Sequence, residues 1–273
     1  MDEMLKSMLD ALFSFDTSSL GNLSKNLGTY NSTAYDLVTS LHSTAVVPVS
    51  SVVISIILVL ELARNAAHIE GDQQMGVKII AGTMFKSALL VIAAQNSMMF
   101  LDAINEISSF IISKLSVGKT AAASLPSGIT DSISDAGNVD KAGMLMLLII
   151  PFLVALVAKI VVQVMVILRF AELYMMTAFA SLPIALLGHP DTKSMGVGYL
   201  QRYASVSLQG ATLMLAVTVY GVLSGVTTLE GLDDGESLSE WIVSSYPQLL
   251  LAPVLLIILV MASGRIAKAV VGQ

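Results

Sequence analysis

The chain has 273 residues, of which 55% are hydrophobic and 12% are charged, and its mean hydropathy is +0.80; these values exclude a soluble globular domain, because such domains carry about 25% charged residues. The net charge of −6 excludes the strongly basic domains that bind nucleic acid. The chain has no cysteine, which excludes disulfides, iron–sulfur clusters and thiol nucleophiles.

Residues 1–43 form the first predicted segment. Apolar residues recur at helical spacing from Met1 to Phe13 and predict a short amphipathic helix. This helix either lies on a membrane or partner, or packs as an ordinary tertiary helix. Residues 21–43 are rich in Ser, Thr, Asn and Gly and predict a loop or a polar lead-in to a helix.

Residues 44–112 are predicted to contain the first two membrane spans, at 44–63 and 77–95, because both are apolar runs of bilayer length. Pro48 falls in the first turn of the first span, where its missing N–H costs little. The second helix is expected to continue as an amphipathic extension. Its apolar stripe is Phe100, Ile104, Ile107 and Ile111, and its opposite face is Asp102, Asn105, Glu106 and Ser109.

Residues 113–142 are rich in Ser, Ala, Gly and Asp and predict an extracytoplasmic surface loop. Residues 143–273 form the C-terminal membrane region, which begins with an apolar run at 143–188. A straight helix of that length would measure about 69 Å, whereas a bilayer core is about 30 Å thick. Only four residues with a charge or an amide interrupt the run: Lys159, Gln163, Arg169 and Glu172.

The run at 143–188 has two interpretations. Two spans joined near Arg169 would give six spans in all, whereas one span with a helical extension would give five. Residues 167–173 contain no Gly, Pro, Asn or Asp, although a hairpin normally needs such turn residues. We therefore favour a continuous helix that crosses the bilayer at 145–168, bends at Pro183 and stops at Gly188.

Two more spans, at 204–229 and 247–262, follow a polar connector at 189–202 and flank an acidic loop at 230–240. The Lys/Arg bias places this loop outside the cell membrane and the C-terminus in the cytoplasm. Five spans place the N-terminus and residues 113–142 outside, whereas six place the N-terminus inside. The bare Lys/Arg count slightly favours six, and the missing turn favours five.

No catalytic, cofactor or metal site is predicted, so we expect a protein that is not an enzyme. Residues 118–120 resemble the end of a phosphate-binding loop, but Ser113 stands where that motif needs Gly. No nucleophile and base are placed as a pair. Three histidines lie in separate polar segments without metal-ligand spacing: His42, His68 and His189.

Polar residues inside the predicted spans are candidates for function. Lys86, Lys159 and Gln163 either pair with Glu61 or Glu172, reach the membrane interface, or line an aqueous path. Lys159 and Gln163 are one turn apart and share a helix face. Gly221 and Gly225 form a pattern that suits helix packing within or between subunits.

Arg169 and Glu172 are expected to anchor the long helix at the inner interface, because each would cost about 2.5–3.5 kcal/mol at the bilayer centre. Pro183 and Gly188 would shape the end of that helix.

A family resemblance lies in the same region. Its residues are Arg169, Glu172, Tyr174, Thr177, Phe179, Pro183 and Gly188, followed by Tyr199-Leu200, Gln209-Gly210 and Tyr220. This pattern resembles TrbL-type inner-membrane subunits of type IV secretion and conjugation systems, in the variant of Gram-positive conjugative elements. The likeness covers about residues 143–225, and the N-terminal third agrees only in layout. Family members typically have Ala-Pro where this chain has Leu182-Pro183.

The resemblance implies a structural and conduit role. Such subunits form a homo-oligomeric ring in the lipid membrane, contact cytoplasmic ATPases and a coupling protein, and support an extracytoplasmic stalk or adhesin. They lie on or near the path of DNA–relaxase substrates, and no catalytic residue carries over. The alternative is a secondary transporter or small ion channel with a site at Lys86, Lys159 and Gln163. It is less favoured because the sequence shows no internal repeat.

Overall fold

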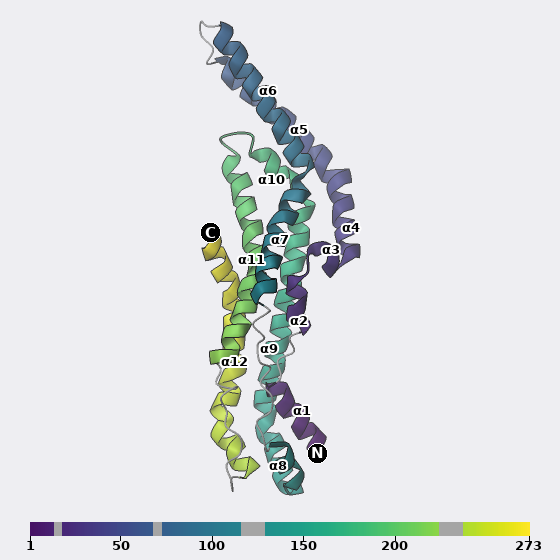
Figure 1. Ribbon diagram of the computed structural model, residues 1–273, viewed down its shortest axis with the longest axis vertical. Helices are drawn as coiled ribbons and strands as arrows, with labels where there is room; N and C mark the ends of the chain where they lie inside the picture. The colour runs from purple at the N-terminus through teal and green to yellow at the C-terminus, as the bar shows by residue number, and fades with distance from the viewer. Residues whose placement is uncertain (14–17, 68–72, 116–128, 224–236) are drawn as a thin grey trace. The chain divides into compact units, whose positions relative to one another are not determined.

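A computed structural model describes the chain except residues 14–17, 68–72, 116–128 and 224–236, and every regular element in the described part is a helix (Figure 1). The α-helices are α1 (Asp2–Phe13), α2 (Ser18–Gly21), α3 (Leu27–Tyr30), α4 (Ser32–Leu41), α5 (Val47–Ala67), α6 (Gln73–Gln95), α7 (Ser97–Leu115), α8 (Ile129–Asp135), α9 (Asn138–Ala178), α10 (Ser181–Leu186), α11 (Lys193–Leu223) and α12 (Leu238–Val271). A 3₁₀ turn lies at Asn22–Ser24 and a π-helical turn at His42–Val46.

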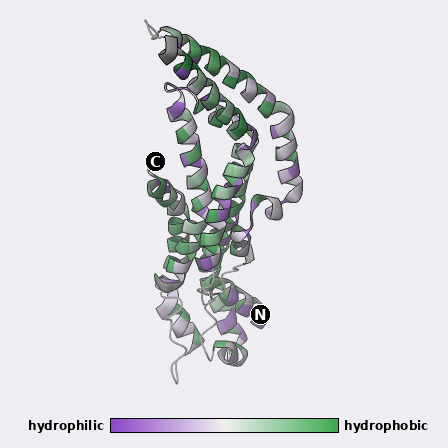
Figure 2. Cartoon of the chain, turned by 45° about the horizontal axis from the view of Figure 1, so that its top comes forward, coloured by the Kyte–Doolittle hydropathy of each residue, from purple (hydrophilic) through white to green (hydrophobic). Residues whose placement is uncertain are grey.

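Five helical segments in the described part are long and apolar enough to cross a bilayer, which confirms the predicted helical membrane fold with five spans. Apolar residues make up most of the long helices (Figure 2). The five segments are Ser32–Ala66, Gly76–Gln95, Asn138–Ala178, Lys193–Gly221 and Leu238–Val271.

Helix α9 continues through Arg169 without a turn, as the sequence predicts. It buries one stripe at helical spacing and leaves apolar residues exposed on its other faces. The buried stripe includes Met144, Leu148, Ala155, Ala158, Val162, Val166, Phe170 and Leu173. At 41 residues, α9 is about 60 Å long, so it either tilts strongly or extends well beyond the bilayer core.

The end of the apolar run differs from the expectation of a bend at Pro183. Helix α9 already ends at Ala178, and Pro183 lies in the first turn of α10. Proline has no N–H for the carbonyl four residues earlier, that of Phe179, and its ring crowds this carbonyl. The chain therefore tightens into 3₁₀-type bonds, from Phe179 N to Met176 O (3.1 Å) and from Ala180 N to Thr177 O (3.3 Å).

Several span boundaries also differ from the prediction. The first span begins at Ser32 rather than 44, because α4 runs through the π-helical turn into α5. That turn, in which Val47 N donates to His42 O, lies directly before Pro48. Residues 193–202, expected as a connector, form the first turns of α11, where their polar side chains find partners on neighbouring helices.

Helix α7 is a separate helix after a turn at Asn96, and its buried side is not the expected apolar stripe. The expected apolar stripe is largely exposed, at Phe100, Ile107 and Ile111, whereas Asn105 and Ser108 are buried. Water does not compete inside packed helices, so polar side chains there bond to one another. The sequence pattern defined the two faces of this helix but did not predict which of them faces the protein.

The helices form two compact units, which we describe separately. The first contains Met1–Ser24, Ile111–Leu168 and Gln209–Ile266. In its core, Leu5 and Leu9 of α1 pack with Ile129 and Ile133 of α8 and with residues of α9 and α12. Lys141 forms an ion pair with Asp2 (2.9 Å). Part of the 113–142 segment is thus a packed helix, α8, within the described residues.

The second unit contains Lys25–Phe110, Arg169–Leu208 and Ala267–Gln273. Its α5–α6 hairpin packs against α10 through Ile54, Ala94, Ile184 and Ala185. Five of the residues that the sequence singles out belong to this unit: Lys86, Arg169, Glu172, Pro183 and Gly188.

Candidate functional site

Arg169 is the most deeply buried charged side chain of the second unit, at 2% exposure. Its Nε donates to Val206 O (3.3 Å) and its Nη2 donates to Ser207 O (3.0 Å), both on α11. Hydrogen bonds from charged groups are stronger than neutral ones. The guanidinium thereby joins α9 to the first half of α11.

Ser207 extends this contact to a third helix. Its Oγ donates to Asn105 Oδ1 (3.2 Å), and Ser108 Oγ donates to Ser207 O. Asn105, Ser108 and Ser207 are buried. We call Asn105, Ser108, Arg169 and Ser207 the polar core; it connects α7, α9 and α11.

Glu172 lies almost one turn beyond Arg169 and pairs with Arg202 of α11. Arg202 Nε donates to Glu172 Oε1 at 3.1 Å, and Nη2 donates to the same oxygen. Both side chains are partly exposed, so the pair contributes little to stability on its own. It fixes the register between α9 and α11 next to the polar core.

Aromatic side chains attach the short helix α3 to the same part of α9. The rings of Tyr30 and Phe170 stack with centroids 3.7 Å apart. Tyr174 Oη donates to Leu27 O (2.6 Å) and Asn31 O (3.2 Å). The Tyr174 side chain of α9 thus supplies the hydrogen bonds for the backbone carbonyls at both ends of α3.

His42 is buried where three helix interruptions meet. Its Nδ1 lies 3.1 Å from Ala178 O, the last residue of α9, and its Nε2 lies 3.1 Å from Ser97 Oγ, the first residue of α7. His42 itself begins the π-helical turn. A histidine that donates to the last carbonyls of a helix stabilises its C-terminus.

Gly188 and Gly196 allow α10 to approach its neighbours closely. A Cβ at Gly188 would clash with Leu90 and lie 3.3 Å from Ile57 Cγ2. A Cβ at Gly196 would lie 2.5 Å from Pro183 O and 2.6 Å from Leu187 Cδ2. Gly188 thus follows the helix end, as predicted, and also serves as a packing residue, while Gly196 was not identified from the sequence.

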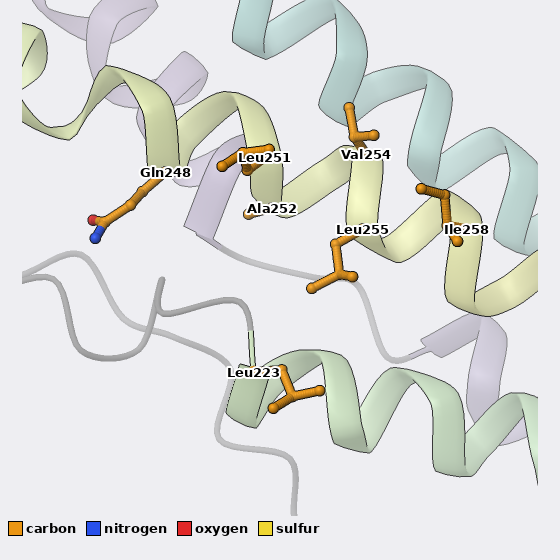
Figure 3. A pocket seen from close by; sticks show the side chains of 7 residues that line it. All are labelled: Leu223, Gln248, Leu251, Ala252, Val254, Leu255 and Ile258. Atoms are coloured by element: carbon orange, nitrogen blue, oxygen red, sulfur yellow. The ribbon is translucent and has the colours of Figure 1, made fainter.

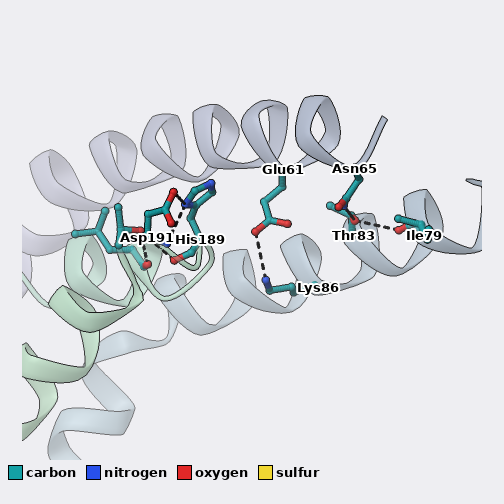
Figure 4. A network of polar contacts seen from close by, with 9 residues as sticks. Glu61, Asn65, Ile79, Thr83, Lys86, His189 and Asp191 are labelled. Atoms are coloured by element: carbon teal, nitrogen blue, oxygen red, sulfur yellow. Dashed lines mark hydrogen bonds and ion pairs between the residues drawn. The ribbon is translucent and has the colours of Figure 1, made fainter. Parts of the chain in front are cut away.

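The α5–α6 hairpin carries polar contacts inside two apolar spans (Figure 4). Lys86 Nζ lies 3.6 Å from Glu61 Oε1, and this oxygen accepts no hydrogen bond in the described structure. Asn65 Nδ2 donates to Thr83 Oγ1 (2.7 Å). Lys86 is thus paired with Glu61, which is one of the interpretations that the sequence left open.

The remaining predicted residues belong to the first unit or lie outside the described residues. Lys159 and Gln163 belong to the first unit, where Lys159 is half-buried and Gln163 is exposed. Gly221 is half-buried near the end of α11, and Gly225 lies outside the described residues. Helix packing through Gly221 therefore stays a prediction.

The structure also contains a polar recess in the second unit and an apolar recess in the first. A polar recess of about 280 Å³ in the second unit is lined by Tyr35, Asp102 and Glu106, among others. Burial raises the pKa of Asp102, while a hydrogen bond from Tyr35 (3.0 Å) opposes this shift. An apolar recess of about 320 Å³ in the first unit is lined by six aliphatic residues and Gln248 (Figure 3).

Sequence reasoning found Arg169 and Glu172 but not their partners. Asn105 was placed on the polar face of its helix without a partner, Ser108 was not singled out, and His42 was placed in a polar segment. The spacing of Asn105 and Ser108 by three residues, on one helix face, was the available signal. Within the described ranges, no three His, Asp or Glu side chains are arranged as metal ligands.

The chain matches the family described as TrbL/VirB6 plasmid conjugal transfer like protein over residues 17–181, which is more than half of its length. No curated protein matches the chain. The matched residues contain three of the five candidate spans completely. The similarity thus includes the N-terminal third, where only the layout was expected to agree, and ends at residue 181 rather than near 225.

Proposed function

Because this chain belongs to the TrbL/VirB6 plasmid conjugal transfer family and is a multi-pass membrane component of conjugal transfer and type IV secretion, we propose that it acts as a scaffold and channel subunit of the transfer machine. In this proposal several copies form a ring in the membrane, at or near the path of the DNA–relaxase substrate. The observation that carries it is the family match across the spans Ser32–Ala66, Gly76–Gln95 and Asn138–Ala178.

The contacts of the second unit support a structural rather than a catalytic role. Arg169 is bonded to backbone carbonyls, and Glu172 is paired with Arg202. These groups hold α7, α9 and α11 together, so they stabilise a bundle that other subunits can bind. The expected partners are further copies, a cytoplasmic ATPase, a coupling protein and an extracytoplasmic stalk or adhesin.

Deletion of the gene from its conjugative element tests the function, with DNA transfer to recipient cells as the readout. We expect transfer to be lost and to return when the wild-type gene is supplied in trans. Purification from a lipid environment, followed by native mass spectrometry, tests the assembly. A protein that stays strictly monomeric and brings no secretion subunit with it would contradict the ring.

Topology is tested with single cysteines, since the chain has none of its own. Gly21 is exposed, and a Cβ there meets no atom within 4 Å, so Gly21→Cys should fold normally. Five spans predict that an impermeant thiol reagent labels Gly21→Cys in intact cells. Lys268→Cys, at the other end, should be labelled only after permeabilisation. Labelling of Gly21→Cys from the cytoplasmic side alone would contradict an extracytoplasmic N-terminus.

A further inference from the structure

A row of polar residues lies along the α5–α6 hairpin of the second unit and continues into the segment after α10. We call it the polar seam, and its members are Glu61, Asn65, Thr83, Lys86, His189 and Asp191 (Figure 4). Asn65 donates to Thr83, and Lys86 pairs with Glu61 one turn further along. A Cβ added to Gly188 would meet Leu90 and Ile57, which lie one turn beyond that pair. His189 therefore comes next along the same hairpin.

Lys86 lies in the middle of its span. It is ten residues after Gly76 and nine before Gln95, so either end of the span is about 14–15 Å away along the helix. A lysine side chain is too short to bring its ammonium group to either interface from there. Snorkelling, by which lysines near helix ends avoid lipid, therefore does not account for Lys86.

The pair with Glu61 does not satisfy these groups. The side chain of Lys86 is 56% exposed, and that of Glu61 is 14% exposed. Their contact at 3.6 Å is an ion pair without a hydrogen bond, and Glu61 Oε1 has no hydrogen-bond partner in the described structure. Charged groups within membranes face a bundle interior or a water-filled cavity, so lipid tails are an unfavourable neighbour for this face.

Gly82 lies one turn before Lys86 on the same side of α6 and leaves this face open. It is exposed, and a Cβ added to it would meet no atom within 4 Å. Phe85, by contrast, is 68% exposed, about 100° around the helix from Lys86 and about 60° from Gly82, and Met84 is 58% exposed, about 160° around the helix from both. Helix α6 therefore has an open polar side and an apolar side at the same depth.

We propose that the polar seam lines a water-accessible path through the membrane in the assembled machine. This inference rests on the proposed channel role and adds which hairpin lines the path. Water would supply the hydrogen bonds that Lys86 and Glu61 lack from one another. The apolar side of α6, with Phe85, faces lipid.

Cysteine accessibility tests this proposal in membranes of cells that carry the complete transfer machine. The variants are Lys86→Cys and Gly82→Cys on the polar side and Met84→Cys, on the opposite side, as the matched control at the same depth. We expect a charged, membrane-impermeant thiol reagent to modify the two polar-side cysteines at least about tenfold faster than Met84→Cys, because charged groups are excluded from lipid. Gly82→Cys keeps Lys86 and its ion pair, so it decides the question if Lys86→Cys does not accumulate.

Equal, slow modification of Gly82→Cys and Met84→Cys in folded protein would overturn the proposed path. DNA transfer by the same cells separates this failure from a failure of the proposed function. Normal gene-dependent transfer with an unreactive Gly82→Cys would refute only the path. Reactive Gly82→Cys in cells whose transfer does not depend on the gene would refute the function.

Discussion

Replacement of Arg169 tests whether the buried guanidinium ties helices together or anchors α9 at the membrane interface. In the structure its two donors bond to Val206 O at 3.3 Å and Ser207 O at 3.0 Å. A hydrogen bond from a charged group contributes about 1.5–3 kcal/mol. Lysine keeps the charge but lacks the planar fork that reaches two carbonyls. Arg169→Lys should therefore lower the free energy of unfolding by about 1.5–3 kcal/mol.

Arg169→Met provides the contrasting variant. Methionine fills much of the same space and removes the charge together with its desolvation cost, so the loss of the two bonds is largely offset. Ser207 O also keeps its bond from Ser108 Oγ. We expect Arg169→Met to stay within about 1.5 kcal/mol of the wild type, and hence to be no less stable than Arg169→Lys.

Urea unfolding in detergent micelles, followed by far-UV circular dichroism, measures both variants. Glu172→Gln serves as a control, because the partly exposed pair with Arg202 should cost at most about 1 kcal/mol. If Arg169 instead anchors α9 at the membrane interface, Arg169→Lys should be more stable than Arg169→Met. A neutral Arg169→Lys beside a strongly destabilised Arg169→Met would refute the role of the buried hydrogen bonds.

Two further predictions concern packing and pH. Gly196→Ala should destabilise the protein by about 1–3 kcal/mol, because its Cβ would lie 2.5 Å from Pro183 O. Gly198→Ala, with no atom within 4 Å of its Cβ, should stabilise the protein by about 0.5–1 kcal/mol. Equal shifts in the melting temperature of the two variants would contradict the close approach of α10 and α11. Burial raises the pKa of Asp102 above its ordinary 3.8, so the folded state holds this proton more tightly than the unfolded state. Its contribution to stability is thus present below pH 3.8 and is lost as the pH rises through the raised value. Asp102→Asn should remove this part of the decline in urea titrations over that pH range, and an unchanged slope would show that another group is responsible.

The sequence by itself determined the class of the protein and favoured five spans over six. An apolar run of bilayer length is a local property, because lipid demands it regardless of what the helix packs against. The continuous helix through Arg169 was also predictable, since residues 167–173 offer no turn chemistry. The break near Pro183 was expected, although its position at Phe179 and Ala180 follows from the missing N–H of proline, because Phe179 O accepts from Leu182 N (3.2 Å) instead.

Only the tertiary structure decided which side of each helix faces the protein. Membrane helices are apolar on most sides, so hydrophobic periodicity does not show their packed face, and the pattern of α7 left that face undecided. The partners of the buried polar groups are distant in sequence, because Ser207 follows Arg169 by 38 positions and Ala178 follows His42 by 136 positions. The polar core and the His42 junction exist because packing brings these groups within hydrogen-bond distance, which local residue patterns do not encode.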